Sequence, residues 1–386
     1  MAYILNAGNM VLTNLTLVES GETVNIGTEN GLIKSVGVAQ PAVDQFILEF
    51  ENAIAFPGLI NSHDHLDFNL FPQFGDRCYD NYTEWGAHIH QHYKAEINAV
   101  LKIPIALREQ WGMVKNLLSG VTTVVNHGEP AQTTERLINV FEDYCFIHSV
   151  GFEKRWKWKL NNPLKRHFPV AIHVGEGKDD VAYDEINSLI NWNYLGKQLV
   201  GVHGVAMDGL QAKSFDALVW CPQSNYFLLD KTADVKRLKK STNILFGTDS
   251  TLTGNWDVWD HIKMARKTDM LTDRELYEAL TTNAANIWKL NNKGLQPGQN
   301  ADLVIARKKE GSTMNSFFEV DPEDILLVMI NGEVKLFDEC LNKLANAKFN
   351  KITINGAVKY LYGDVPTLIS RIREYYPKAS FPIQQA

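Results

Sequence analysis

The sequence lacks the features of secreted, membrane-spanning and nucleic-acid-binding proteins. Its four cysteines stand apart without CxxC spacing, which argues against a disulfide framework or a cysteine-bound zinc. No run approaches the roughly 18 uninterrupted apolar residues of a membrane span, and the first residues lack the basic region and cleavage site of a signal peptide. The net charge of −7 disfavours nucleic acid, which requires a basic face. We therefore expect a cytoplasmic protein that acts on a small molecule, with no membrane and no nucleic acid as a partner.

Short apolar runs that end in small or polar residues recur through the middle of the chain. In order, they are AIAFPGLIN, GVTTVVN, YCFI, FPVAI, QLVGV, DALVW and TNILFGT. Continuous runs rich in β-branched residues are typical of strands buried on both faces of a parallel sheet. Helix-like stretches such as AQTTERLINVFEDY and DDVAYDEINSLINW lie between them. This alternation predicts an α/β fold, a TIM-like (β/α)8 barrel with its site at the carboxyl ends of the strands.

The spacing of these runs departs from a regular barrel in two places. Only seven runs are visible where a barrel needs eight, and a short, basic, Trp-rich segment separates Phe146 from Ala171. We therefore expect the fourth strand to be degenerate, displaced or absent. Residues 68–118 separate the first run from the second, and this length predicts a helical cap over the mouth.

The two ends of the chain differ from the middle. Short alternations of polar and apolar residues with Gly and Asn-Gly turn signals predict β-hairpins there. We expect residues 1–55 and 295–386 to form one small composite β-sandwich domain, with the barrel at 56–294 inserted between them.

Histidines and an aspartate follow several of the predicted strands. His63 and His65 lie at i and i+2 after the first run, so both imidazoles can point to one face of a strand. Taken alone, His-x-His is a weak signal that also fits a polar pair on a solvated loop. His173, His203 and Asp249 follow three other runs at the same predicted edge. Nitrogen and oxygen ligands in this mixture indicate a catalytic metal site with a position left for water.

Glu176 lies three residues beyond His173 in His-Val-Gly-Glu. Its carboxylate could sit beside a metal-activated water, accept the proton of that water and pass it to a leaving amine. The alternative is an acid favoured by the dipole at a helix N-terminus. Asp249 could help to orient the water, and His203 could polarise the C=N or C=O group of the substrate.

Other candidates carry weaker signals. His127 could reach the site from the second strand, although a supporting or core histidine fits the pattern better. Trp85 could line an aromatic pocket, although most such residues only pack. The histidines of HIHQH (His88, His90 and His92) fall in a predicted helix, where a solvated cap is favoured over a second metal.

Eight segments in a fixed order resemble the amidohydrolase superfamily, in its mononuclear branch that is similar to cytosine deaminase and triazine hydrolase. They are FPGLINSHDHL, SGVTTVVNHG, HVGEG, VHGVAMD, CPQSN, FGTDS, LTTNAANIWKL and GLQPGQNADLVI. The resemblance implies that His63, His65, His173 and Asp249 bind a single divalent ion. It further implies that Glu176 is the proton shuttle and that His203 polarises the substrate. The CPQSN turn borders the substrate pocket in similar deaminases, which makes Ser224 and Asn225 candidate substrate contacts.

The departures from the family pattern limit what the resemblance implies. The chain is short near the fourth strand, and Asp64 between the two histidines is unusual. Lys157 and Lys159 lie near the place where two-metal members carry a bridging group, but the HxxE pattern favours one metal. Zinc is the favoured ion, with iron or manganese as alternatives, and the family allows a homo-oligomer.

The favoured function is hydrolysis of a carbon–nitrogen bond by a metal-activated water, in the deamination of an aminated heterocycle or a nucleobase-like molecule. The alternative within the superfamily is a hydrolase of an amide, a cyclic amide or a C–Cl bond. A metal-free scaffold is disfavoured because all four ligand candidates and Glu176 are present together.

Overall fold

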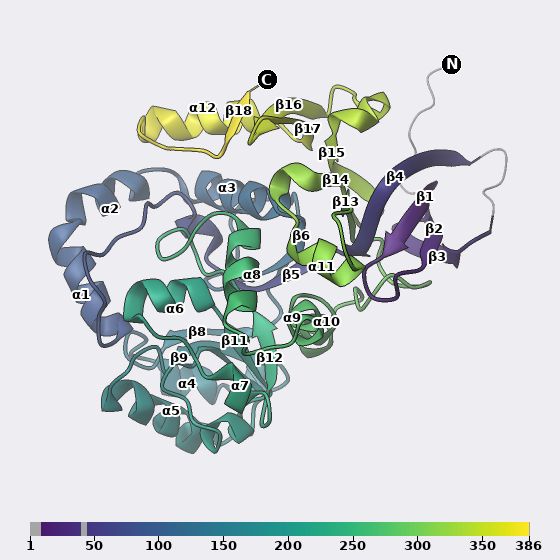
Figure 1. Cartoon of the computed structure of the whole chain (residues 1–386). Coiled ribbons are helices and arrows are strands. Elements are labelled where there is room, and N and C mark those ends of the chain that lie inside the picture. The colour runs from purple at the N-terminus through teal and green to yellow at the C-terminus, as the bar shows by residue number, and fades with distance from the viewer. Residues whose placement is uncertain (1–8, 40–44, 386) are drawn as a thin grey trace.

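The computed structural model describes residues 9–39 and 45–385 of the chain. The parts of the predicted terminal domain at 1–8, at 40–44 and at position 386 lie outside the described residues. In Figure 1 the chain starts in the strands at the right and ends in α12 (Val365–Tyr375) and β18 (Ile383–Gln385), which lie above α3 (Ile105–Leu118).

Eight parallel strands form the middle of the fold, paired in the orders β5-β6-β7 and β12-β11-β10-β9-β8. Just beyond β12, the amides of Thr248 and Asp249 donate to the carbonyl of His63 on β5, at 3.1 and 3.0 Å. The first and last strands therefore meet at the carboxyl edge, as a TIM-like α/β fold requires. The strands are β5 (Leu59–Asp64), β6 (Val121–Asn126), β7 (Asn139–Phe141), β8 (Cys145–Ser149), β9 (Val170–Val174), β10 (Leu199–His203), β11 (Ala217–Trp220) and β12 (Asn243–Phe246).

The short strand of this set is the third and not the fourth. β7 has three residues and lies inside the stretch that we expected to be helical, whereas the segment between β8 and β9 contains α4 (Trp156–Leu160) and no strand. The expectation of a degenerate fourth strand is therefore wrong in its position. Leu137, Ile138, Val140 and Phe141 have the i, i+1, i+3, i+4 spacing of a helix face, and pairing with β6 overrides that spacing.

Two helices near the mouth of the barrel begin at side-chain caps. The side chain of Asn81 accepts from two amides in the first turn of α1 (Tyr82–His92), and Asp179 accepts from one in α5 (Asp180–Trp192). Such caps satisfy amides that have no partner within the helix. The other helices are η1 (Leu66–Phe68), α2 (Lys94–Leu101), η2 (Pro163–Lys165), η3 (Gln211–Ser214), α6 (Pro222–Leu229), α7 (Val235–Leu238), α8 (Val258–Lys267), α9 (Asp273–Leu280), α10 (Thr282–Ile287), α11 (Thr313–Phe318), η4 (Pro322–Asp324) and η5 (Glu339–Leu344).

Strands from both ends of the chain share one ten-stranded sheet, in the order β18-β16-β17-β15-β14-β13-β4-β1-β2-β3. β4 joins the two ends, because it pairs with β1 in parallel and with β13 in antiparallel. The structure does not confirm a sandwich, and the predicted domain boundaries stay a prediction. The remaining strands are β1 (Met10–Leu17), β2 (Thr23–Glu29), β3 (Leu32–Gly37), β4 (Phe46–Pro57), β13 (Leu303–Arg307), β14 (Ile325–Ile330), β15 (Glu333–Asp338), β16 (Phe349–Ile354) and β17 (Ala357–Tyr362).

Gly58 connects the sheet to the barrel. It lies between β4 and β5, where a Cβ atom would come within 2.1 Å of the hydroxyl oxygen of Thr122 on β6. A glycine is required here because any side chain would displace β6. This close approach fixes the start of β5, the strand that carries His63 and leads directly to His65.

Candidate metal centre

The four candidate ligands and His203 come from four barrel strands and meet at one edge. His63 lies on β5 and His65 follows it directly, while His173 lies on β9. His203 ends β10, and Asp249 follows β12. All five side chains are buried, with exposed fractions between 1 and 7%. The structure therefore brings together the residues that the sequence placed at the carboxyl ends of the strands.

The distances between these side chains fit a single divalent ion. The Nε2 atoms of His63 and His173 are 3.1 Å apart, and those of His63 and His65 lie 3.8 and 3.7 Å from Oδ1 of Asp249. Two ligands about 2.1 Å from one metal in a tetrahedral arrangement would lie about 3.4 Å apart. Two trios have all their ligand atoms within 4.8 Å of one another, namely His63, His65 and His173, and His63, His203 and Asp249. The donor set therefore fits a metal at this place.

Two of these residues have a left-handed backbone. The φ angle is 71° at His203 and 59° at Asp249. This conformation is uncommon for residues other than glycine, and asparagine, aspartate and histidine adopt it more readily than the rest. Both residues lie immediately beyond or at a strand end, so the turn directs their side chains into the mouth of the barrel.

The electrostatics favour the protonation states that a metal requires. Burial is the main cause that lowers the pKa values of His63 and His173 well below the usual value, and neighbouring histidines lower them further. Burial alone would raise the pKa of Asp249, but His65, His203 and hydrogen bonds from Ser224 and Thr253 outweigh it, so the pKa is lowered. Neutral imidazoles and a carboxylate are the forms that bind divalent cations.

Glu176 faces His203 at the same edge. Its Oε1 lies 3.5 Å from Nε2 of His203. Burial raises the pKa of Glu176 well above the usual value, and the nearby carboxylates of Asp249 and Glu185 add to this effect. A buried carboxyl with a raised pKa can both accept and return a proton near neutral pH.

Hydrogen bonds from α6 orient two groups of the site. Nδ2 of Asn225 lies 2.9 Å from Nδ1 of His203, and the hydroxyl of Ser224 donates to Oδ2 of Asp249 at 2.8 Å. Thr232 donates in turn to Oδ1 of Asn225 at 3.2 Å. This chain of bonds fixes the amide orientation, so Nδ1 of His203 accepts and its Nε2 carries the proton. Ser224 and Asn225 are fully buried behind the polar groups of the site, and their predicted contact with substrate stays a prediction.

A cavity of about 460 Å³ opens beside the candidate ligands. His65, His173, His203, Asp249 and Glu176 form its floor. Its walls come mainly from η1, α1 and the loop after β12, and are formed by Phe68, Tyr82, Thr83, Trp85, Gly86, Ala87, Ile89, His90, His148, Phe152, Leu228, Ser250, Leu252 and Thr253.

Trp85, a sequence candidate, lines this cavity, and its indole N–H donates to the carbonyl of Phe74 at 2.7 Å. His127 lies behind the ligands instead: its ring centroid is 4.2 Å from that of His173, and it is not part of the cavity wall that the described residues form.

His148 is a wall residue that the sequence candidates did not include. It lies on β8, its ring centroid is 5.0 Å from that of His173, and burial lowers its pKa to about 4, with a further contribution from His65. Like the candidate ligands, His148 directly follows an apolar run, YCFI. That position is the signal that could have identified it.

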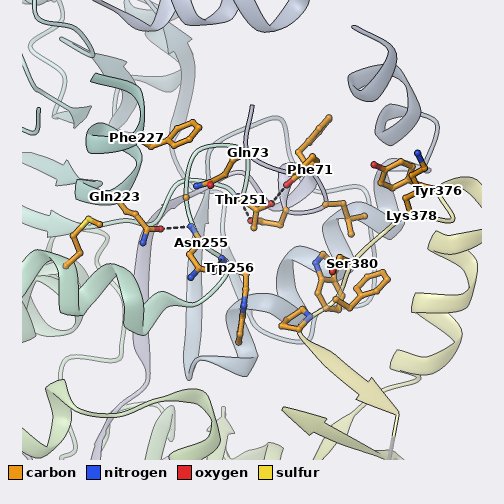
Figure 2. A pocket seen from close by; sticks show the side chains of 18 of the residues that line it. Phe71, Gln73, Gln223, Phe227, Thr251, Asn255, Trp256, Tyr376, Lys378 and Ser380 are labelled. Atoms are coloured by element: carbon orange, nitrogen blue, oxygen red, sulfur yellow. Dashed lines mark hydrogen bonds between the residues drawn. The ribbon is translucent and has the colours of Figure 1, made fainter. Parts of the chain in front are cut away.

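A larger cavity, of about 730 Å³, is lined in part by the loop after η1 and the loop after β12 (Figure 2). The loops are held together by Thr251, whose hydroxyl donates to the carbonyl of Phe71 at 2.8 Å. Tyr376 and Lys378 of the C-terminal segment face Gln223 and Asn255 across this cavity (Figure 2). Among the described residues that line it there is no histidine and no carboxylate. The smaller cavity is therefore the candidate reaction site.

Comparisons with known proteins are consistent with this geometry. The sequence profile described as Amidohydrolase family matches residues 156–335. A 5-methylthioadenosine/S-adenosylhomocysteine deaminase of Pyrococcus furiosus is 22% identical over 385 residues, which cover 80% of this chain and 90% of that protein.

Two solved structures show the same fold. An adenosine deaminase from Xanthomonas campestris with bound zinc has a TM-score of 0.74 at 16% identity, covering 96% of this chain and 98% of that chain. A triazine hydrolase variant has a TM-score of 0.73 at 14% identity, covering 96% and 100%. In the described part of the chain, no helix has the length and apolar character needed to cross a membrane.

Proposed function

We infer that the chain belongs to the amidohydrolase superfamily and hydrolyses carbon–nitrogen bonds other than peptide bonds, and we propose that it deaminates a purine nucleoside or a similar aminated heterocycle. One observation carries the proposal. Glu176 and His203 face each other at 3.5 Å beside the candidate metal ligands, at the floor of a cavity with aromatic walls.

The proposed ion is zinc, held by His63, His65, His173 and Asp249, since three imidazoles and one carboxylate suit a borderline cation. When bound, the ion supplies the Lewis acidity that makes water a nucleophile near neutral pH. In the reaction water adds to the ring carbon that carries the amino group, the C–N bond breaks, and a carbonyl compound and ammonia result.

Glu176 moves the proton in this reaction. Its carboxylate accepts a proton from the attacking water and donates it to the nitrogen of the substrate, so that ammonia is the leaving group. The raised pKa of Glu176 supports this role, because the protonated form must last long enough to be used. Glu185 supports its backbone, since it accepts from the amide of Gly175 at 2.7 Å.

His203 donates a hydrogen bond toward the reacting atoms. Because Asn225 occupies Nδ1 at 2.9 Å, the proton lies on Nε2, which faces Glu176 and the cavity. A fixed donor at this place stabilises negative charge that develops on the substrate during attack. Burial lowers the pKa of His203 to about 4, so the ring acts as a neutral donor.

The walls of the cavity favour a flat, uncharged substrate. Phe68, Tyr82, Trp85 and Phe152 contribute aromatic faces, which suit a heterocyclic ring. Among the described residues that line the cavity, the carboxylates are Glu176 and Asp249 at the floor, and no lysine or arginine is present. A chain of similar sequence bears a name that refers to adenosine derivatives, which supports a 6-aminopurine as the substrate.

The test measures release of ammonia from adenosine, 5′-methylthioadenosine, guanine, cytosine and an aminotriazine, and separately the hydrolysis of a cyclic amide and of a chlorotriazine. We expect steady, zinc-dependent release with an adenine nucleoside, and no release after removal of zinc by a chelator. Hydrolysis of the cyclic amide or of a chlorotriazine, with no ammonia from any purine, would contradict the proposal and favour the alternative function.

A further inference from the structure

A buried ion pair adjoins the two histidines at the end of β5, on the side that faces α3. Asp64, which separates His63 from His65, and Lys115, on α3, both have fully buried side chains. Nζ of Lys115 donates to Oδ2 of Asp64 at 3.0 Å. Successive side chains on a strand point to opposite faces, so Asp64 points toward α3 while His63, the residue before it, points toward His173 and Asp249.

Three amide side chains complete the surroundings of Asp64. Asn116 donates to Oδ2 at 2.7 Å and Asn61 to the same atom at 3.3 Å, while Asn69 donates to Oδ1 at 2.8 Å. The exposed fraction of each of these asparagines is 3% or less. The carboxylate is therefore held from α3, from β5 itself and from the loop after η1.

The same cluster reaches the ligand on β12. The hydroxyl of Thr248 accepts from Asn61 at 2.8 Å and from Lys115 at 3.4 Å, and it donates to the carbonyl of Asp249 at 3.0 Å. Oδ1 of Asn61 also accepts from the amide of Thr248 at 3.1 Å. One cluster thus connects Asp64, which lies between the two histidines at the end of β5, with Thr248, the residue before the carboxylate ligand after β12.

α3 packs very closely against the start of η1. A Cβ atom at Gly112 would lie 2.2 Å from the carbonyl oxygen of Leu66, immediately after His65. The amide of Asn116 also donates to the carbonyl of Gly112 at 2.9 Å. The absence of a side chain at this position therefore brings Lys115 and Asn116 within reach of Asp64.

We propose that Lys115 is a positioning residue of the metal centre, which acts through Asp64 to hold His63 and His65, and through Thr248 to hold Asp249. The proposal rests on the metal-binding part of the proposed function and is independent of the substrate. Groups that orient metal ligands from behind commonly change metal affinity by 10- to 100-fold when they are removed. A buried carboxylate that loses its cation must also move toward water or another partner, and Asp64 cannot move without its two histidine neighbours.

The experiment measures the Zn²⁺ affinity of folded protein in competition with a chelator, after removal of metal and a check of folding by circular dichroism. Lys115→Met should weaken Zn²⁺ binding by 10- to 100-fold. Because this variant leaves a buried charge without a partner and folds less readily, Asp64→Asn/Lys115→Met removes both charges. We expect the double variant to recover much of the melting temperature of the metal-free protein while its Zn²⁺ affinity stays at least tenfold reduced.

Thr248→Val gives a milder change, because valine keeps the shape and loses only the hydroxyl. We expect a loss of Zn²⁺ affinity of about threefold to tenfold, smaller than that of Lys115→Met, because the β5 side of the cluster stays intact.

Lys359→Met is the matched control. Lys359 is also fully buried and pairs with an aspartate, Asp338, at 2.7 Å, but it lies on β17 in the terminal sheet. This variant should lower the melting temperature and leave the Zn²⁺ affinity of the folded protein unchanged.

The proposal is overturned if those Lys115, Asp64 and Thr248 variants that fold bind Zn²⁺ within threefold of the wild-type affinity. It is also overturned if the double variant restores both stability and affinity, which is the result expected of a purely structural pair. A wild-type chain that binds no Zn²⁺ would instead contradict the proposed function itself.

Discussion

The mouth of the barrel and the ten-stranded sheet use left-handed backbone in different ways. In the sheet, Asn30, Asn331 and Asn355 have φ angles of 52°, 50° and 48°, each directly before a glycine in a turn between two strands. Asparagine adopts this conformation at little cost. At the mouth the same conformation occurs at His203 and Asp249, where it directs groups of the site. The difference indicates that the sheet is built for stability and the mouth for geometry.

Both regions also contain a fully buried lysine paired with an aspartate. On β17, Lys359 donates to the carbonyls of Glu323 and Ile325 as well as to Asp338, each at 2.7 Å. It therefore links β17 to η4, β14 and β15 within the terminal part of the chain. At the mouth, Lys115 donates to the side chains of Asp64 and Thr248, which adjoin the candidate ligands. Similar pairs thus serve different purposes, and the following changes should separate the two regions.

The largest effect is expected at the mouth, from His173→Ala. Loss of an imidazole 3.1 Å from that of His63 should remove both bound metal and turnover, because three ligands remain for a site built for four. Metal analysis together with an ammonia assay measures both. His167→Ala, at an exposed histidine, is the control and should change neither. Stoichiometric metal in the His173 variant would exclude this residue from the ligand set.

Glu176→Gln should separate chemistry from metal binding within the mouth. We expect kcat/KM to fall by roughly 10²- to 10⁴-fold, the usual contribution of a general acid–base group, with metal content nearly intact. Glu84→Gln is the control, since Glu84 is on the same side of the barrel but pairs with Arg77 at 3.2 Å outside the cavity. Activity within tenfold of wild type in the Glu176 variant would show that another group moves the proton.

Phe337→Ala tests the opposite expectation for the sheet. Phe337 is fully buried, with ring centroids 4.9 Å from those of both Phe349 and Tyr360. Its removal should lower the free energy of unfolding by about 3–5 kcal/mol, as measured by denaturant titration. The kcat/KM of the protein that remains folded should stay within twofold. A tenfold loss would mean that the sheet contributes directly to the geometry of the site.

The smallest effect concerns pH. Burial raises the pKa of Glu185 to about 7, although hydrogen bonds from Gly175 and Tyr82 oppose the shift. A folded pKa above the unfolded value means that this group stabilises the fold most below about pH 4.5 and that its contribution is lost as the pH rises to about 7. In the sheet, Asp338 has the opposite sign: burial alone would raise its pKa, but Lys359 outweighs burial and lowers it, so its contribution is lost in acid.

Glu185→Gln should therefore flatten the decline of the melting temperature between pH 4.5 and pH 7. Scanning calorimetry at several pH values measures this slope for the variant and for wild type. An unchanged slope would show that Glu185 does not titrate differently in the folded chain.

Much of the barrel could be predicted because its strands are buried on both faces and leave continuous apolar runs. β7 was missed because three residues are too few to show a strand pattern, and the apolar residues around it happen to have helical spacing. The apolar run before His148 was correctly expected to be a strand. Because β7 was overlooked, this strand was counted as the third of the barrel, whereas it is the fourth. Pairing between strands, which the sequence does not display, decides such cases.

The site was easier to predict at its centre than at its supports. The positions of His63, His65, His173 and Asp249 at strand ends can be seen in the sequence, because parallel strands bring their carboxyl ends together. The partner of Asp64 could not be seen, because Lys115 is 51 residues away and a lysine on a helix is usually exposed to solvent. The aromatic walls depend on how α1 lies against the barrel, which no local pattern specifies.

The most direct test of the account is anomalous X-ray scattering at the zinc edge from crystals of the zinc-loaded chain. We predict one peak per chain, about 2.0–2.2 Å from nitrogen or oxygen atoms of His63, His65, His173 and Asp249. No peak at this place, or a peak that contacts other residues instead, would contradict the claim that four side chains from the ends of β5, β9 and β12 hold one metal.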